Sequence, residues 1–228
     1  YVPPPPWEGL LPSYFHAAAL SDQPVCSSTV AIPRSVLEEV GGFPTDICIG
    51  EDLITWFRVA IRYPIAFTWK ICAIYHMESA NRTCALADSL KWEKDILIAV
   101  QQSLQEGSVP ADMVADVTEF FASYQISLAY RCISQGALQE ARSILASCDT
   151  RLFRGERLAG LIAASVPAPL LRCVLQAKHL LTLKITEPLS PHIKGHGGAG
   201  KAGQPSSKRR THWLNWPTAD HFAKWVCS

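Results

Sequence analysis

The spacing of apolar residues divides the chain into two parts, and the change comes near residue 87. Before it, short apolar runs alternate with breaks at proline and glycine, a pattern typical of strands and short helices that follow one another. The runs predict strands at residues 25–32, 65–70 and 71–76, and helices at residues 35–40 and 51–62. The proline-rich segment 1–24 is predicted to be a loop.

Beyond residue 87 the apolar spacing is that of helices alone. Helices are predicted at residues 88–105, 110–134 and 137–147, and Gly107 and Gly136 end the first two. The last two would form a hairpin, and one face of its second helix is apolar: Leu138, Ala141, Ile144 and Leu145. A single hairpin is not a repeat array, so we interpret it as a packing extension.

Charge and composition change again near the end of the chain. Residues 1–183 contain 14 Lys and Arg against 18 Asp and Glu, whereas residues 184–228 contain 7 against 2. The tail is also rich in Gly, Pro, Ser and His, a composition that builds no packed core. We therefore predict three parts: an α/β part over residues 1–86, a helical extension over 87–186 and a basic flexible tail over 187–228.

The bulk composition excludes two classes of protein. The formal net charge is +1, and outside the tail no basic patch of a nucleic-acid-binding protein occurs. No uninterrupted run approaches the ~18 apolar residues of a membrane-spanning helix. The eight cysteines are scattered without a C-x-x-C pair, so we expect reduced, mostly buried thiols and a cytoplasmic location.

Glu51 and Asp52 carry the candidate chemistry, because they begin a predicted helix directly after Gly50. Unpaired amide groups and the helix dipole favour negative charge at a helix N-terminus. A carboxylate that stays ionised there, at the mouth of a pocket, can accept a proton from an attacking hydroxyl. Helical spacing puts Trp56 one turn beyond Asp52 as an apolar flank. Arg58 shares the stripe of Glu51 and can pair with it or reach a phosphate.

An ordinary structural explanation stands beside this one. Two acidic residues at a helix start are common for stability alone, and a lone Trp is more often part of a core. The motifs around the acidic pair favour the chemical interpretation. Residues 25–83 contain four of them in order: Gly41-Gly-Phe-Pro44, Gly50-Glu-Asp-x-x-x-Trp-x-Arg58, Tyr75-His76 and Asn81-Arg82.

The order and spacing of these motifs resemble the C-terminal half of family 2 glycosyltransferases. The resemblance implies a Rossmann-like fold of the GT-A type and an inverting hexosyltransferase that uses a nucleotide-sugar donor and a glycan, lipid or other hydroxyl acceptor. Asp52 would be the general base, with Glu51 as its electrostatic neighbour, and Trp56 and Arg58 would bind the acceptor. His76 and Arg82 would contact the donor diphosphate, and His76 is also a candidate metal ligand.

Members of this family hold Mn²⁺ or Mg²⁺ against the diphosphate with an Asp-x-Asp motif, because such hard cations prefer carboxylate oxygens. No Asp-x-Asp occurs in these residues, and the segment before residue 25 is too short for a donor-binding half. The chain begins at Tyr1 rather than Met. We therefore expect it to be a fragment of a longer transferase and to have little activity on its own.

A second hypothesis comes from another class of protein. In it the chain is a non-catalytic remnant whose helical hairpin and basic tail bind a partner protein or a membrane. Residues 158–184 are apolar and basic and contain no acidic residue. They would either lie on an anionic membrane, at its inner face, as a peripheral contact, or pack against the body of the transferase.

Overall fold

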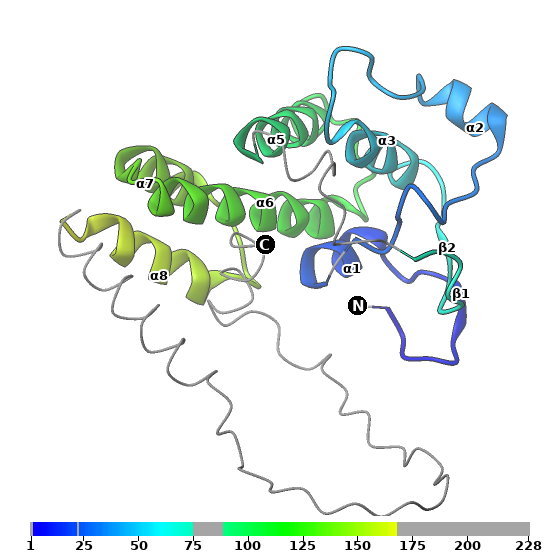
Figure 1. The fold of residues 1–228 in the computed structure, drawn as a ribbon, viewed down its shortest axis with the longest axis horizontal. Coiled ribbons are helices and arrows are strands. Elements are labelled where there is room, and N and C mark those ends of the chain that lie inside the picture. Colours follow the sequence, from blue (N-terminus) through cyan, green and yellow to red (C-terminus); the bar gives the residue numbers. More distant parts are fainter. Residues whose placement is uncertain (1, 22, 75–88, 168–228) are drawn as a thin grey trace, which may run out of the picture. The chain divides into compact units, whose positions relative to one another are not determined.

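The computed structural model describes residues 2–21, 23–74 and 89–167, which belong to one compact unit of the chain (Figure 1). This part is mostly helical, with one two-stranded sheet. Within it, no helix is long and apolar enough to cross a membrane. Its elements are β1 (Glu8–Leu10), α1 (Tyr14–Leu20), α2 (Arg34–Glu39), α3 (Glu51–Ala60), β2 (Ala66–Thr68), α5 (Ser89–Gln105), α6 (Val114–Ser134), α7 (Leu138–Ser147) and α8 (Arg154–Ser165).

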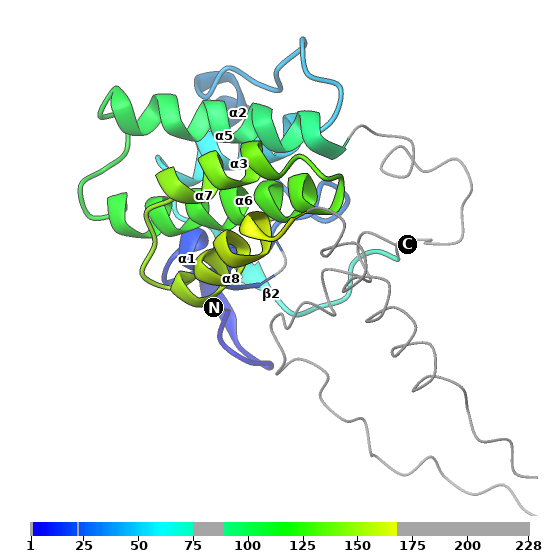
Figure 2. The same ribbon diagram turned by 90° about the vertical axis from the view of Figure 1, so that its left-hand side faces the viewer.

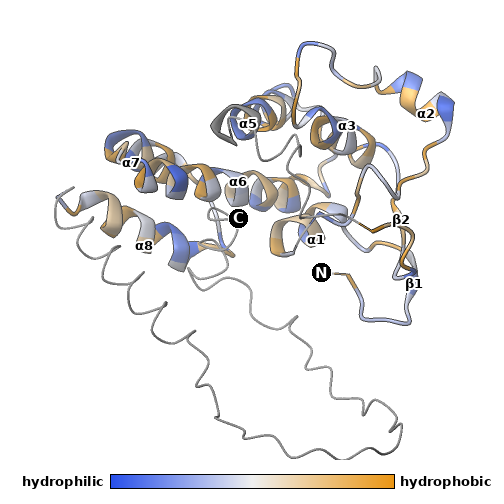
Figure 3. Cartoon of the chain, in the orientation of Figure 1, coloured by the Kyte–Doolittle hydropathy of each residue, from blue (hydrophilic) through white to orange (hydrophobic). Residues whose placement is uncertain are grey.

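The long helix α6 lies in the middle of this unit, where it contacts α1, α5, α7 and α8 (Figures 1 and 2). In Figure 3 hydrophobic and hydrophilic stretches alternate along α5, α6 and α7, as in amphipathic helices. Buried apolar residues extend over the length of α6: Val117, Phe120, Ala122, Leu128, Ala129 and Cys132. Contacts with four other helices explain why so much of α6 is buried.

Three phenylalanines join α6 to the N-terminal helices. Phe15 of α1 lies edge-to-face with Phe57 of α3 at 5.6 Å and with Phe120 of α6 at 5.5 Å, and the last two rings stack at 6.4 Å. All three are at most 2% exposed. Burial of one Phe contributes about 1.5–3 kcal/mol, so this cluster ties together residues on both sides of the boundary predicted at residue 86. That boundary lies outside the described residues, as does the one at residue 186.

A short antiparallel pair holds the N-terminal segment beside the chain that follows α3. β1 pairs with β2, with Gly9 opposite Phe67, and the amide of Leu11 extends the pairing to the carbonyl of Ile65 at 2.8 Å. The indole N–H of Trp69 also donates to the carbonyl of Pro3 at 2.8 Å. The proline-rich start of the chain is therefore held by hydrogen bonds between its backbone and residues 65–69.

The helices predicted at 35–40, 51–62, 88–105, 110–134 and 137–147 are confirmed, with small shifts at their ends. The strand predicted at 65–70 is confirmed in the shorter form of β2. Residues 71–74 of the next predicted strand are irregular, and the rest of that strand lies outside the described residues. The α/β fold of the GT-A type remains a prediction.

The strand predicted at residues 25–32 is wrong. The amide of Thr29 donates to the carbonyl of Cys26 at 2.9 Å and closes a turn, and residues 26–29 are exposed. β-branched residues suit a strand, but a strand also needs the backbone of a neighbouring strand. Among the described residues, no strand pairs with this segment.

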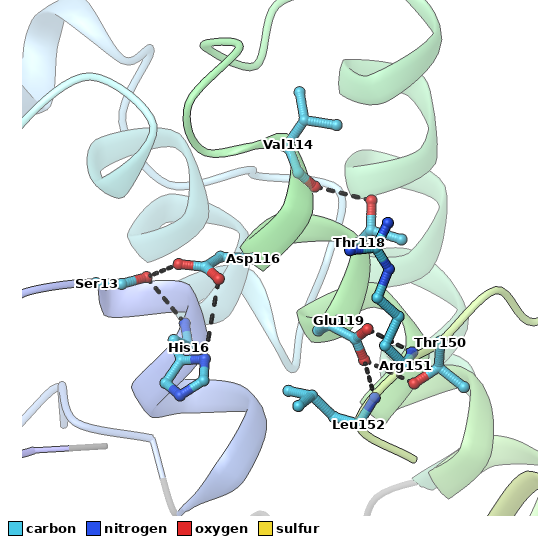
Figure 4. Close-up of polar contacts among 9 residues, drawn as sticks. All are labelled: Ser13, His16, Val114, Asp116, Thr118, Glu119, Thr150, Arg151 and Leu152. Atoms are coloured by element: carbon cyan, nitrogen blue, oxygen red, sulfur yellow. Dashed lines mark hydrogen bonds and ion pairs between the residues drawn. The ribbon is translucent and has the colours of Figure 1, made fainter. Parts of the chain in front are cut away.

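The loop predicted at residues 1–24 contains β1 and α1. Ser13 caps α1, because its hydroxyl oxygen accepts the amide of His16 at 3.1 Å while its proton goes to Asp116 of α6 (Figure 4). The many prolines of this segment led to the prediction of a loop, although a Ser ahead of a run that contains three alanines is an ordinary signal for a helix start. Helix α8 was not predicted either, since Gly155 and Gly160 lower its helix propensity.

Glu119 fixes the loop between α7 and α8 (Figure 4). Its carboxylate accepts the Thr150 hydroxyl at 2.6 Å and the amides of Arg151 at 2.6 Å and Leu152 at 3.2 Å. The hydroxyl oxygen of Thr150 in turn accepts the amide of Phe153 at 2.9 Å. Glu119 and Thr150 thus bond three successive amides of the loop that leads into α8, whose N-cap residue Phe153 makes no side-chain bond.

Gly160 allows α8 to approach α7 closely, and this contact predicts opposite effects of two similar substitutions. A Cβ at residue 160 would lie 2.8 Å from Cδ1 of Leu145, whose side chain is fully buried and would have to shift within a packed core. Gly155, on the same helix, has open space at that position. We expect Gly160→Ala to lower the free energy of unfolding by about 1–3 kcal/mol. Gly155→Ala should raise it by about 0.5–1 kcal/mol through helix propensity.

Chemical denaturation of the two variants beside the parent chain measures both changes. A Gly160→Ala protein as stable as the Gly155→Ala protein would contradict the close contact between α7 and α8.

Candidate functional site

Two glycines place the first aromatic side chain of the site. Gly41 and Gly42 follow α2 with φ angles of 83° and 66°, a left-handed conformation that costs glycine little. The amide of Gly42 donates to the carbonyl of Leu37 at 2.9 Å and closes the end of α2. Phe43 comes directly after this turn.

The turn packs on α3. The rings of Phe43 and Trp56 lie 5.8 Å apart in an edge-to-face contact. The hydroxyl of Thr55 donates to the carbonyl of Glu51 at 2.8 Å and lies 3.4 Å from the carbonyl of Gly42. The structure therefore brings together the Gly-Gly-Phe-Pro and Gly-Glu-Asp motifs, which the sequence separates by a loop.

The acidic pair lies at a helix start, as the sequence predicts. Gly50 enters α3 with a φ of 85°, and Glu51 and Asp52 occupy the first turn. Gly50 provides no side chain to cap the helix. The amides of the first turn therefore face the carboxylates of this turn or solvent, an arrangement that favours negative charge.

Asp52 is the best-oriented acidic group of this turn. Its Oδ1 accepts the amide of Leu53 at 2.8 Å, and its Oδ2 accepts the hydroxyl proton of Ser27 at 2.6 Å. The side chain is half-buried, and Ser27 is exposed. A carboxylate has about four acceptor positions in all. Asp52 can therefore accept a further hydrogen bond from a hydroxyl that arrives from solvent.

Two phenols lie near this carboxylate, that of the buried Tyr14 and that of the half-buried Tyr124. The hydroxyl of Tyr14 donates to Gln23 at 2.9 Å, and the amide of Gln23 donates to the hydroxyl oxygen of Tyr124 at 2.9 Å. Burial raises the pKa of both phenols, and the negative charge of Asp52 raises it further. Both tyrosines therefore stay protonated at neutral pH and add no negative charge beside Asp52.

Trp56 does not form the exposed flank that its spacing predicts. Its side chain is 3% exposed and packs against Phe43, which is 42% exposed. The interior face of α3 also carries the buried Ile54 and Phe57. The indole of Trp56 is buried with them, although Trp56 lies only one turn from Asp52. The prediction that Trp56 binds the acceptor is therefore corrected: Trp56 is buried beneath Phe43 and is not accessible to an acceptor.

Glu51 and Arg58 are both half-buried on α3. Among the described residues, neither a hydrogen bond nor an ion pair joins the two side chains, so the predicted pairing is not formed there. The second alternative, contact of Arg58 with a phosphate or an acceptor, stays a prediction. His76 and Arg82 lie outside the described residues.

The described residues contain no group of three or more His, Cys, Asp or Glu side chains placed to hold a metal ion. They therefore assign no ligand to the Mn²⁺ or Mg²⁺ that the family resemblance implies. The candidate His76 belongs to the segment 75–88, for which nothing is described. The cation stays an expectation from the resemblance.

Ser27 is the hydrogen-bond partner of Asp52 that the sequence pattern missed. It lies in the segment that was predicted as a strand, and that prediction gave its side chain no contact with Asp52. The polar run Ser27-Ser-Thr29 was the available signal for a turn. Its contact with Asp52 depends on how the chain folds back onto α3, which no local pattern reports.

The cysteines within the described ranges are free, and their exposure differs from the expectation. Cys26, Cys48 and Cys72 are exposed, whereas Cys132 and Cys148 are buried. The prediction of mostly buried thiols is thus wrong for the first three. Burial raises the pKa of Cys148 to about 11 and raises that of Cys132 as well.

Comparisons with models of protein families, with curated proteins and with solved structures found no match. The grounds for a function are therefore the order of the motifs and the geometry around Asp52.

The difference in burial predicts which thiols react. A thiolate is the reactive form, and at pH 8 a group with a pKa of about 11 is almost entirely protonated. We expect iodoacetamide at pH 8 to label Cys26, Cys48 and Cys72 in the folded chain, and Cys132 and Cys148 only after denaturation. Peptide mapping by mass spectrometry resolves each site. Rapid labelling of Cys148 in the folded chain would contradict its burial between α6, α7 and α8.

Proposed function

We propose that residues 25–83 form the acceptor side of an inverting glycosyltransferase in which Asp52 is the general base. The observation that carries the proposal is the carboxylate of Asp52, which is half-exposed at the start of α3 and fixed by two hydrogen bonds. The packing of the Gly-Gly-Phe turn on the same helix supports the proposal, because it brings the Gly-Gly-Phe-Pro motif next to the Gly-Glu-Asp motif. The proposed fold of this part is of the GT-A type.

The proposed reaction is a single displacement. The oxygen of an acceptor hydroxyl attacks the anomeric carbon of the donor sugar. The bond from that carbon to the diphosphate breaks, and the nucleoside diphosphate leaves with the electron pair. The proton of the hydroxyl passes to the carboxylate of Asp52, which must lie within hydrogen-bond reach, about 2.6–3.2 Å.

Ser27 is a positioning residue in this proposal. A carboxylate that rotates freely spends little time in the orientation that accepts the proton. The hydroxyl of Ser27 holds Oδ2 while the amide of Leu53 holds Oδ1, so the plane of the carboxylate is set before an acceptor arrives. Glu51 adds negative charge to the same turn, and in the described part of the chain its carboxylate has no such pair of contacts.

Phe43 replaces Trp56 as the aromatic residue beside the acceptor. It is 42% exposed and lies on Trp56, one turn along α3 from Asp52. An exposed ring can pack against the apolar face of a sugar, as aromatic side chains do in ligand sites. Arg58 stays a candidate contact for a polar group of the acceptor.

The donor requires residues other than the acidic pair. These 228 residues contain no Asp-x-Asp motif, so we propose that the Mn²⁺ or Mg²⁺ and the diphosphate are held mainly by another segment. Such a cation would offset charge on the departing diphosphate. His76 and Arg82 follow the acceptor side in sequence and are the candidates for added contacts to the diphosphate.

The substitution Asp52→Asn tests the proposed base. We expect it to lower kcat by about 10²- to 10⁴-fold, because the amide cannot accept the proton. Binding of the nucleotide sugar should stay close to that of the parent, since Asp52 acts on the acceptor. The measurement is release of nucleoside diphosphate from a panel of nucleotide sugars and acceptors, with the protein expressed from its whole reading frame.

Asp112→Asn is the matched control, because Asp112 is an exposed carboxylate in the turn before α6, outside residues 25–83. It removes the same charge and should leave kcat within about twofold, as expected for an exposed residue outside the site. Circular dichroism of both variants verifies the fold. Full turnover in a folded Asp52→Asn protein removes Asp52 from the role of base.

A further inference from the structure

Helix α8 presents an apolar stripe to solvent. Leu158 and Ile162 are 60% and 61% exposed and lie one turn apart. The opposite side of α8 is packed, since Gly160 and Ala164 are buried and Gly160 lies against Leu145 of α7. Within the described ranges, the two aliphatic side chains are therefore left on the outer side of the bundle.

Positive charge accompanies this stripe. Arg151 and Arg154 are exposed at the start of α8, and Figure 3 shows that hydrophilic start followed by a more hydrophobic length of helix. Residues 151–167 contain three Arg and a single acidic residue, Glu156. Glu156 is half-buried. We call Leu158, Ile162, Arg151 and Arg154 together the α8 face.

We propose that the α8 face docks on an anionic membrane surface. Aliphatic side chains of an interfacial helix enter the boundary between headgroups and acyl chains, while its basic residues meet the lipid phosphates and carboxylates. α8 has 12 residues, which is short of the ~20 that span a bilayer. The helix therefore lies on the membrane and does not cross it.

The charge of this region favours a membrane over the other occupants of an apolar face. A second copy of the chain would bring the same excess of positive charge to the contact, and like charges oppose association. Anionic lipid instead neutralises Arg151 and Arg154 of the α8 face.

This docking does not rest on the proposed transfer reaction. Asp52 and Ser27 lie on α3 and on the turn before α2, and neither belongs to the α8 face. The two proposals therefore fail separately: loss of membrane binding leaves the test of Asp52 untouched, and an inactive site leaves the test of α8 untouched.

Sedimentation of the full chain with vesicles tests the docking. We expect binding to vesicles of phosphatidylcholine and phosphatidylserine at a ratio of about 70 to 30, a composition in which each basic residue near the surface adds attraction. Binding to pure phosphatidylcholine vesicles should be at least about tenfold weaker. Raising the salt to about 0.5 M should also weaken it, because salt screens charge.

The double variant Leu158→Ser/Ile162→Ser should reduce binding to the anionic vesicles by about tenfold or more. Ile98→Ser is the matched control, because Ile98 is an aliphatic residue of α5 with the same exposure, 62%. It should bind like the parent. A charge variant, Arg151→Gln/Arg154→Gln, should also bind less tightly than Arg34→Gln/Arg62→Gln, which removes two exposed charges elsewhere.

Three results overturn the proposal. The first is absence of binding to anionic vesicles by the folded parent chain. The second is equal binding by the Leu158→Ser/Ile162→Ser variant and the Ile98→Ser control. The third is a concentration-dependent dimer in analytical ultracentrifugation that the double variant abolishes, which would assign the α8 face to a second copy of the chain.

Discussion

The contact of Phe15, Phe57 and Phe120 is the constraint on which the rest of the described structure depends. It joins α1, α3 and α6 in one core, although these helices come from distant parts of the sequence. Because Phe57 and Asp52 belong to the same helix, the core that buries one fixes the position of the other. Burial is not directional, so it sets where α3 lies and leaves the orientation of its first turn to other interactions.

Directional contacts supply that orientation. Left-handed glycines end α2 and begin α3, which sets the path of the loop between them. The hydroxyl of Ser27 and the amide of Leu53 then hold the two oxygens of Asp52. The site thus combines a rigid helix with an open end, the arrangement expected of a base that must meet a hydroxyl from solvent. In the proposed function this geometry is the acceptor side of a sugar transferase.

The sequence predicted local features well and tertiary ones poorly. Helices α3, α5, α6 and α7 follow from apolar spacing and glycine stops, both of which are local signals. The failed strand at 25–32 and the buried Trp56 have a common cause, since pairing and burial depend on which distant segment lies alongside. The acidic pair at a helix start was predicted because helix N-termini obey local electrostatics. Ser27 was not, because its partner lies on another element.

The proposed transfer requires an acceptor to meet α3 at its first turn. The most direct test is a crystal structure of the protein expressed from its whole reading frame, with a nucleoside diphosphate and an acceptor bound. We expect a carboxylate oxygen of Asp52 within about 2.6–3.2 Å of the reacting hydroxyl oxygen. An acceptor bound away from the start of α3, or a different carboxylate at that distance from its hydroxyl, would contradict it.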